Sequence, residues 1–351
     1  MSNLRVTAPL LLGWVLAGSG CDANARSKAT SARQRVVFHD ACDASGAVSL
    51  DRHRFAVADD EDSVLRIYDA ERGGEPLYMV NVADSLDLAR DEQKKKKKKP
   101  KKQQKKKPRK PPETDIEAAT SIGSRAYWIT SHALTKSGKR NPARFRFFAT
   151  ELPTREGPRA LIGAPYRGLV EAMRADARLA ALGIDGASRR SPDKGGLNIE
   201  GMTGTPDGKL LLGLRSPVPQ GKALVFTLEN PDAVLRGEQP RFGAPKLLDL
   251  GGGGVRALSW WRGSYLIIAG SADSSGISRL YRWNGSAAPE HVRSIDFTDF
   301  NPEGFFTPES RNEILVLSND SAREVRGRRC KDLDKSSEKS FRGQWLELSG
   351  K

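Results

Sequence analysis

The chain has 351 residues, 38% hydrophobic and 7% aromatic, enough to bury a sizeable core in one large repeat domain or two ordinary ones. Its formal net charge is +15, but Lys94 to Lys110 alone contributes 13 positive charges and no acid, which leaves +2 for the remainder. The composition therefore excludes a disordered chain and a basic face spread over the whole fold. We expect a monomer without a specific nucleic-acid partner.

The N-terminus is typical of an export signal. Arg5 precedes an apolar run from Ala8 to Ala17, and small residues then lead into Cys21. The run is too short to span a membrane stably. A cysteine at this place resembles the lipobox of bacterial lipoproteins, although Gly18 stands where that pattern prefers leucine. The prediction is a signal peptide over 1–20, a lipidated Cys21 and a tether over 21–34.

This interpretation predicts a protein of the bacterial cell envelope, a periplasmic or outer-membrane lipoprotein held to the membrane by its lipid. The alternative is ordinary signal cleavage after Ala23 to Ala25, which gives a secreted protein. Lipidation of Cys21 leaves two cysteines, Cys42 and Cys330, in a compartment where disulfides persist. A bond between them would contribute on the order of 4 to 5 kcal/mol in the chain-entropy model; the alternative is two inert, buried thiols.

Five segments of the chain align without gaps, each beginning with a polar or charged residue followed by Gly or Ala. A turn rich in Gly, Ser, Pro, Asp and Asn follows, and then a run of β-branched and aromatic residues that ends at a polar residue. This pattern predicts a β-hairpin. The segments are Ser45 to Asp60, Glu117 to His132, Glu200 to Arg215, Arg256 to Ser271 and Glu303 to Ser318.

Further strands follow most of these hairpins. Third strands are predicted at Leu65 to Tyr68, Arg144 to Phe148, Ala223 to Leu228 and Arg279 to Trp283, and fourth strands at Leu77 to Val82, Lys246 to Leu250 and His291 to Phe297. Four strands per repeat are typical of a propeller blade. The sequence thus predicts an all-β fold: a single β-propeller over 35–351 with five four-stranded blades.

Two insertions lengthen the repeat. A Lys-rich stretch over 93–112 is predicted to be a disordered insertion, and apolar residues spaced among charges predict a short helix over 168–182. Six blades remain the alternative if the second insertion hides a degenerate blade. The last repeat has a third strand near Gln344 to Leu348 and no fourth, so we expect Arg35 to His39 to pair there and close the ring.

Several phrases within the repeats resemble a bacterial family, the domain of unknown function thirty-six-sixteen, from about Arg35 to the C-terminus outside the lysine tract. They are Cys42 to Gly46, Asp59 to Tyr68, Asp115 to Glu117, Leu197 to Gly201 and Leu212 to Pro217. The Glu-Gly signature has a weaker local resemblance to the phytase-like esterase propellers. The family resemblance implies an exported propeller and carries no established substrate.

Polar residues two apart on a strand share a face, so Asp115 with Glu117, Asn198 with Glu200 and Asn301 with Glu303 are expected to line one channel mouth. Two carboxylates within about 4 Å repel by about 4 kcal/mol at an effective dielectric near 20. Three arrangements offset this cost: a bound cation such as Ca²⁺, a positive side chain such as Arg215 or Arg256, or raised pKa values that keep an acid protonated.

These arrangements predict different functions. One is a propeller that binds Ca²⁺ or a small ligand without catalysis. The other is a hydrolase: of phosphoesters or carboxylesters if calcium works with Arg215 and His132, or of glycosides if the carboxylates work without metal. A purely structural alternative is that each glutamate caps backbone amides of the neighbouring blade. No catalytic nucleophile can be named.

Two charged segments also have competing interpretations. The run Asp59 to Asp62, with Asp60 as its candidate ligand, binds a cation or forms a solvated turn, and the turn is favoured. The lysine tract holds anionic envelope polymers or lipid head groups, or is simply a tolerated loop. Calcium is the one cofactor that the sequence suggests.

Overall fold

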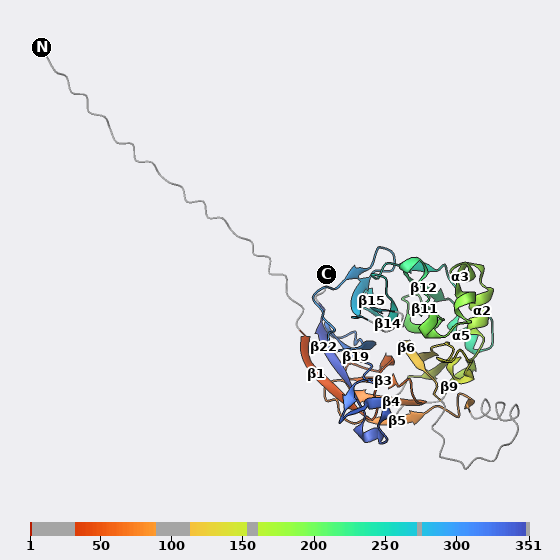
Figure 1. Cartoon of the computed structure of the whole chain (residues 1–351), viewed down its shortest axis with the longest axis horizontal. Coiled ribbons are helices and arrows are strands. Elements are labelled where there is room, and N and C mark those ends of the chain that lie inside the picture. The colour runs from red at the N-terminus through yellow and green to blue at the C-terminus, as the bar shows by residue number, and fades with distance from the viewer. Residues whose placement is uncertain (2–31, 89–112, 153–160, 272–275, 349–351) are drawn as a thin grey trace.

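The computed structural model describes Met1 and residues 32–88, 113–152, 161–271 and 276–348. These residues form five four-stranded antiparallel sheets set around a central axis, which confirms the five-bladed propeller (Figure 1). The predicted signal peptide, Cys21 and the lysine tract lie outside the described residues. Among the residues described, no helix is long and apolar enough to cross a membrane.

Each blade runs from an innermost to an outermost strand. Blade 1 has β2 (Gly46–Ser49), β3 (Arg54–Ala58), β4 (Val64–Asp69) and β5 (Tyr78–Asn81); blade 2 has β6 (Ile116–Ile122), β7 (Arg125–Thr130), β8 (Phe147–Glu151) and β9 (Leu161–Tyr166). Blade 3 has β10 (Asn198–Gly204), β11 (Leu210–Ser216), β12 (Ala223–Leu228) and β13 (Lys246–Leu248), and blade 4 has β14 (Gly254–Trp261), β15 (Ser264–Gly270), β16 (Arg279–Trp283) and β17 (Glu290–His291).

Blade 5 closes the ring with a strand from the other end of the chain. Its order is β18 (Pro302–Phe306), β19 (Glu313–Ser318), β22 (Ser340–Glu347) and then β1 (Ala32–His39). β1 pairs antiparallel with β22, as expected for the closing strand. Phe38 of β1 is fully buried, and its ring lies 5.0 Å from Phe341 and 5.3 Å from both Phe55 and Tyr68. Both termini therefore contribute to one aromatic core.

No sixth blade exists in the described residues. The stretch expected to hold a helix or a degenerate blade forms three short helices, α2 (Leu169–Ala175), α3 (Ala177–Ala181) and α4 (Ile184–Ala187). Their apolar residues pack on the core shared by blades 2 and 3. Shorter elements complete the fold: α5 (Pro231–Leu235), the hairpin β20 (Glu324–Val325) with β21 (Arg328–Arg329), and 3-10 turns η1 (Pro142–Arg144), η2 (Pro192–Lys194), η3 (Pro219–Gly221), η4 (Cys330–Asp332) and η5 (Ser336–Glu338).

Three outer strands differ from expectation. The strand expected over 291–297 is limited to β17, because Ile295 and Phe297 instead pack in a loop between blades 4 and 5. The strand expected from Arg144 starts at Phe147, after the turn η1. β9 was not predicted, because its Gly163 and Pro165 weaken a strand pattern and are residues that occur at sheet edges.

The small residue at the second position of each repeat is explained by the crowding of the innermost strands. A Cβ on Gly304 would lie 2.5 Å from the carbonyl oxygen of Ala44, and one on Gly46 would lie 3.1 Å from the backbone of Ala118. Each innermost strand contacts the next around the ring, with β18 returning to β2. A larger residue at these positions would push two blades apart.

Candidate functional site

The first residue of the repeat occupies a β-bulge in four of the five innermost strands. The register with the second strand shifts at Glu117 in β6, Glu200 in β10, Arg256 in β14 and Glu303 in β18. In blade 1 the equivalent residue, Ser45, lies just before β2. A bulge leaves one residue out of the ladder and re-aims its side chain, so the fold directs one polar side chain per blade to the centre of the ring.

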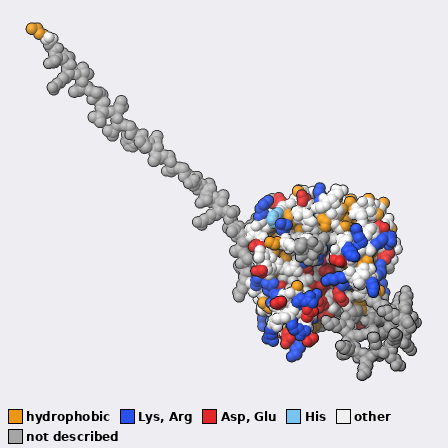
Figure 2. All heavy atoms as spheres, viewed as in Figure 1, with side chains coloured by type: hydrophobic (Ala, Val, Ile, Leu, Met, Phe, Trp, Pro, Cys, Tyr) orange, Lys and Arg blue, Asp and Glu red, His pale blue; other side chains and the backbone are white. Residues whose placement is uncertain are grey.

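Acidic side chains gather near the centre of the ring face shown in Figure 2. The three that matter most, Asp43 before β2, Asp60 after β3 and Glu117 in β6, are called here the carboxyl cluster. A hydrogen bond joins the side chains of Asp43 and Asp60. Within the described residues, no arginine or lysine forms an ion pair with any of the three, and Oδ1 of Asp60 has no hydrogen-bond partner there.

Asp43 is fully buried, Asp60 and Glu117 are half-buried, and the three carboxyls repel one another. Burial raises the pKa of Asp43 well above its ordinary value, and the charges of Asp60, Asp59 and Glu117 raise it further. Burial likewise raises the pKa of Asp60, with Asp59 and Asp115 adding to the effect. For Glu117, burial and then the nearby Glu200 raise the pKa. In the absence of a cation, the cluster therefore holds protons that exposed carboxyls would have lost.

Asp115 lies beside the cluster and has partial compensation. Nη1 of Arg144 is 3.2 Å from its Oδ2, and the Ser131 hydroxyl donates a hydrogen bond to it. Burial nevertheless outweighs these contacts and raises the pKa of Asp115 to about 6. Its backbone amide donates to the carbonyl of Asp60 at 3.1 Å, which ties blades 1 and 2 together at the cluster.

The other two glutamates are neutralised by arginines. Nη1 of Arg215 lies 2.6 Å from Oε1 of Glu200, to which Asn198 also donates at 2.7 Å, and Arg256 forms an ion pair with Glu303. Burial and the charge of Arg215 lower the pKa of Arg256 to about 10. Two of the three arrangements expected to offset the repulsion between carboxylates thus occur side by side. Arginine partners are present on blades 3 to 5, and carboxyls with raised pKa values on blades 1 and 2.

Asn319 was missed by the sequence reasoning. Its Nδ2 donates to Oδ2 of Asp43 and to Oε2 of Glu303, both at 2.7 Å, and so joins blade 5 to the carboxyl cluster. It follows β19 directly, where the repeat pattern marks Ser318 as the last residue. Its position one residue beyond a repeat end is the only sequence signal that could have pointed to it.

Two expected residues lie away from the cluster. The ring of His132 packs on Phe145, Nδ1 lies 2.8 Å from the carbonyl oxygen of Thr130, and burial lowers the pKa to about 4. Its charged neighbours are Arg140, Glu171 and Arg146 rather than the cluster, because Ser131 takes the inward position. Asn301 is exposed at the rim and donates to the carbonyl of Asn319.

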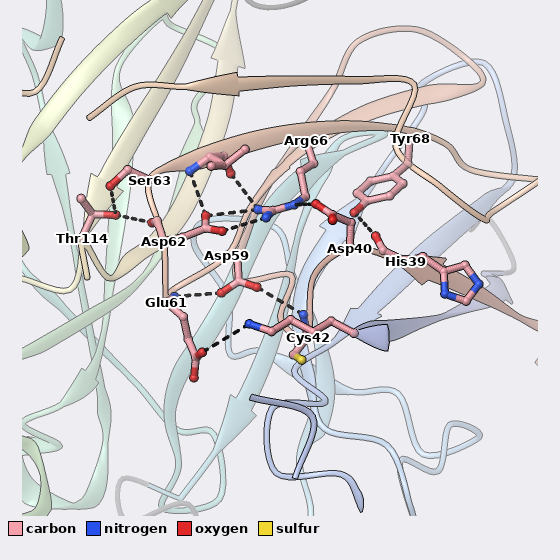
Figure 3. A network of polar contacts seen from close by, with 12 residues as sticks. His39, Asp40, Cys42, Asp59, Glu61, Asp62, Ser63, Arg66, Tyr68 and Thr114 are labelled. Carbon is pink, nitrogen blue, oxygen red and sulfur yellow. Dashed lines mark hydrogen bonds and ion pairs between the residues drawn. The ribbon is translucent and has the colours of Figure 1, made fainter. Parts of the chain in front are cut away.

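The acidic run after β3 forms a turn in which Asp60, Glu61 and Asp62 are partly exposed and Asp59 is buried. Asp59 is only 4% exposed, and its carboxylate accepts hydrogen bonds from the backbone amides of Cys42, at 3.2 Å, and Glu61, at 2.8 Å (Figure 3). Next to it, Arg66 binds Asp62 at 2.7 Å and Asp40 at 3.0 Å (Figure 3). This network holds the segment between β1 and β2 against blade 1 and thereby places Asp43.

A disulfide joins Cys42 to Cys330. The carbonyl of Cys42 accepts from the amide of Asp320, so the disulfide region links the loop after β19 to the residue immediately before Asp43. Asp320 in turn binds Arg342 of β22 at 2.6 Å. The disulfide therefore joins the segment between β1 and β2 to the segment between β21 and β22, at the edge of the carboxyl cluster.

Backbone amides of neighbouring blades are capped by hydroxyl groups instead of glutamates. The amides of Thr307, Gly204 and Trp260 donate to the hydroxyl oxygens of Ser49, Thr120 and Thr203 respectively. The hydrogen bonds shown above for Glu200 and Glu303 come from side chains. A purely structural role for these glutamates as amide caps therefore finds no support in the described residues.

Among the described residues, no group of three or more His, Cys, Asp or Glu side chains is arranged as a ready metal site. The carboxyl cluster could hold an oxygen-preferring cation only with its carboxyls deprotonated. The arginine-bound glutamates would border such a site.

Comparison with known proteins assigns the chain to a family. It belongs to the family described as Protein of unknown function (DUF3616), whose model matches residues 91–303, more than half of the chain. The matched part runs from the connection before β6 to the bulge of β18. The comparison with curated proteins gave no match.

Solved structures with a similar fold include a glutaminyl cyclase from Myxococcus xanthus, with 12% identity and a TM-score of 0.42, covering 91% of this chain and 97% of that one. Another is the PQQ-bound aldose sugar dehydrogenase from Streptomyces coelicolor, with 12% identity and a TM-score of 0.40, covering 90% and 99%. Likeness at this level carries no information about what the present chain binds.

Proposed function

We propose that the protein is an exported, lipid-anchored propeller that binds a cation, Ca²⁺ in the first instance, at the carboxyl cluster. The observation that carries this proposal is the contrast between neighbouring blades: Glu200 and Glu303 have arginine partners, whereas Asp43, Asp60 and Glu117 have none within the described residues. Carboxylates taken out of water without a positively charged partner cost stability unless something else compensates their charge. A bound cation would do so.

Binding must release protons, because the cluster carboxyls have raised pKa values and a cation needs them ionised. Affinity for Ca²⁺ is therefore expected to increase as the pH rises. Calorimetric titration of the whole protein with Ca²⁺ in two buffers of different ionisation enthalpy measures both affinity and proton release. Saturable binding with proton release supports the proposal.

The matched variants are Glu117→Gln in the cluster and Glu347→Gln on the exposed end of β22. We expect the first to lose Ca²⁺ binding and the second to retain it. Absence of saturable heat from the unmodified protein, or equal binding by both variants, would refute the calcium site. Mg²⁺ in place of Ca²⁺ tests selectivity, since Mg²⁺ demands a smaller and more rigid shell.

Export and anchoring rest on the N-terminal sequence alone. We expect radiolabelled palmitate to be incorporated by the full chain expressed in a bacterium and lost in Cys21→Ser. Labelling that persists in the variant, or that never occurs while the protein is released to the medium, would favour ordinary secretion.

A role for the lysine tract has its own test. Binding of the chain without residues 1–34 to anionic vesicles only when 93–112 is present would support that role.

A hydrolase remains the second candidate because Asp115, with a pKa raised to about 6, lies near Glu200, which forms an ion pair with Arg215. A protonated acid beside an ionised carboxylate is the pairing that acid–base hydrolysis requires. Turnover of p-nitrophenyl phosphate, acetate or glycosides, lost in Asp115→Asn, would support catalysis. Failure to turn over any of them leaves the binding function.

A further inference from the structure

A cavity occupies the part of the channel that lies between the innermost strands, on the side of the hairpin turns. It has a volume of about 610 Å³ and is lined by all five innermost strands, from the layer of Ser45, Glu200 and Glu303 to the hairpin turns around Arg52 and Pro206. Asp43, Asp60 and Glu117 are not among its lining residues. The volume is within the range of pockets that bind small organic molecules. This cavity adjoins the proposed cation site at its inner end, through Ser45, Glu200 and Glu303, and extends away from it to the hairpin turns.

The wall of the cavity offers hydrogen-bond donors. The hydroxyl oxygens of Ser49 and Thr120 accept from backbone amides of neighbouring blades, at 3.1 and 3.0 Å. Because these oxygens are fixed as acceptors, each hydroxyl still has its own hydrogen to donate. Both residues line the cavity. The same bonds that hold the blades together thus orient a set of donors around the channel.

The inner end of the cavity offers a buried acceptor. Glu200 is 3% exposed, its Oε1 binds Arg215 and Asn198, and its Oε2 has no hydrogen-bond partner within the described residues. The charges at this end are balanced, since Glu200 pairs with Arg215 and Glu303 with Arg256. A balanced end with a spare acceptor favours a neutral ligand that donates hydrogen bonds over an ion.

An aromatic surface completes the wall. Trp260 lines the cavity towards its hairpin end, is partly exposed, and is held by Tyr265, whose ring centroid lies 4.7 Å away. Its backbone amide is fixed by the hydroxyl of Thr203 at 2.7 Å. An indole supported in this way presents a rigid apolar surface beside polar groups, and this combination suits a ring that is apolar on its face and polar at its edge.

We propose that this cavity binds an uncharged polyhydroxylated ligand, of the size of a mono- or disaccharide. Its hydroxyl groups donate to Glu200 and accept from the wall hydroxyls, and its C–H face packs on Trp260. The ligand enters from the side of the hairpin turns, opposite to the side where Asp43 and Asp60 lie. No covalent step is involved.

The test is saturation-transfer difference NMR of the full chain with methyl α-D-glucopyranoside, N-acetyl-D-glucosamine and maltose, with ethanolamine as a cationic comparison. We expect saturable transfer from at least one sugar and none from ethanolamine. Trp260→Ala and Glu200→Gln should each weaken sugar binding by about tenfold or more, as expected for a buried anchor. Glu347→Gln, an exposed carboxyl on β22 outside the cavity, is the matched control and should bind normally.

Ser121→Trp, which fills the channel from its hairpin end, provides a second route if Trp260→Ala does not fold. It should abolish sugar binding and leave Ca²⁺ titration unchanged, so that failure of this proposal and failure of the cation site are distinguishable. No saturable transfer from any of the three sugars, retention of binding in the filled variant, or a preference for ethanolamine would each overturn the proposal.

Discussion

Replacing Glu117 by glutamine should stabilise the protein at pH 8. Glu117 is half-buried, its pKa is raised by desolvation and by the charges of Glu200, Asp115 and Asp60, and it forms no ion pair within the described residues. An ionised carboxyl in this position therefore opposes folding. Glutamine keeps the shape and removes the charge.

The size of the effect is the cost of leaving one charged group desolvated without a charged partner, about 1 to 3 kcal/mol or more. Because the folded-state pKa is raised, the associated stability is fully present below the unfolded pKa and is lost as the pH rises through the folded pKa. We expect Glu117→Gln to add about 1 to 3 kcal/mol at pH 8 and little at pH 4.

The assay is urea unfolding at both pH values, followed by tryptophan fluorescence and far-UV circular dichroism, without added Ca²⁺. The same substitution at Glu200 provides the contrast, because it removes one partner of a buried ion pair with Arg215 and should destabilise by about 3 to 5 kcal/mol. A Glu117→Gln variant that is less stable than the unmodified protein at pH 8 would refute the reasoning and support a structural role for this residue.

Three further predictions concern the framework. Phe38→Ala should lower the free energy of unfolding by about 3 to 5 kcal/mol, since the ring is fully buried at the closure, whereas Val37→Ala on the exposed side of β1 should change it by less than about 0.5 kcal/mol; equal losses in urea unfolding would contradict the closure argument. Replacing Cys42 and Cys330 by alanine should cost on the order of 4 to 5 kcal/mol and weaken Ca²⁺ binding in calorimetry, because the bond fastens the loops beside Asp43; unchanged affinity would show that the bond serves stability alone. Deleting 93–112 should leave the melting temperature nearly unchanged, and a loss of many degrees in scanning calorimetry would show that the tract belongs to the folded core.

The repeat pattern predicted some of the residues of the candidate site. The sequence placed Glu117, Glu200, Arg256 and Glu303 at one repeat position, and the structure places all four at bulges of the innermost strands. The reasoning from alternate residues on a strand was incomplete, because a bulge interrupts the alternation. Asn301 therefore lies at the rim instead of inside the mouth.

Other parts of the site had no local signal. Whether a carboxyl meets an arginine depends on which side chains adjacent strands and blades bring together, as for Arg256 of blade 4 and Glu303 of the neighbouring blade 5. Asn319 contacts Asp43, 276 positions away in the chain, and no pattern in a single sequence reports such a contact. His132 could not be assigned to the channel or to the core, since adjacent residues at a strand end point in opposite directions.

The sequence by itself determined the class of fold and the strand that closes the ring, and favoured five blades over six, because these depend on the alternation of residue types, on turn residues and on repetition along the chain. Only the tertiary structure decided which carboxyls are neutralised and which remain unpaired, and that the channel beyond them holds a cavity. Charge compensation and cavity shape depend on distances between residues of different blades, and those distances exist only after the ring has closed.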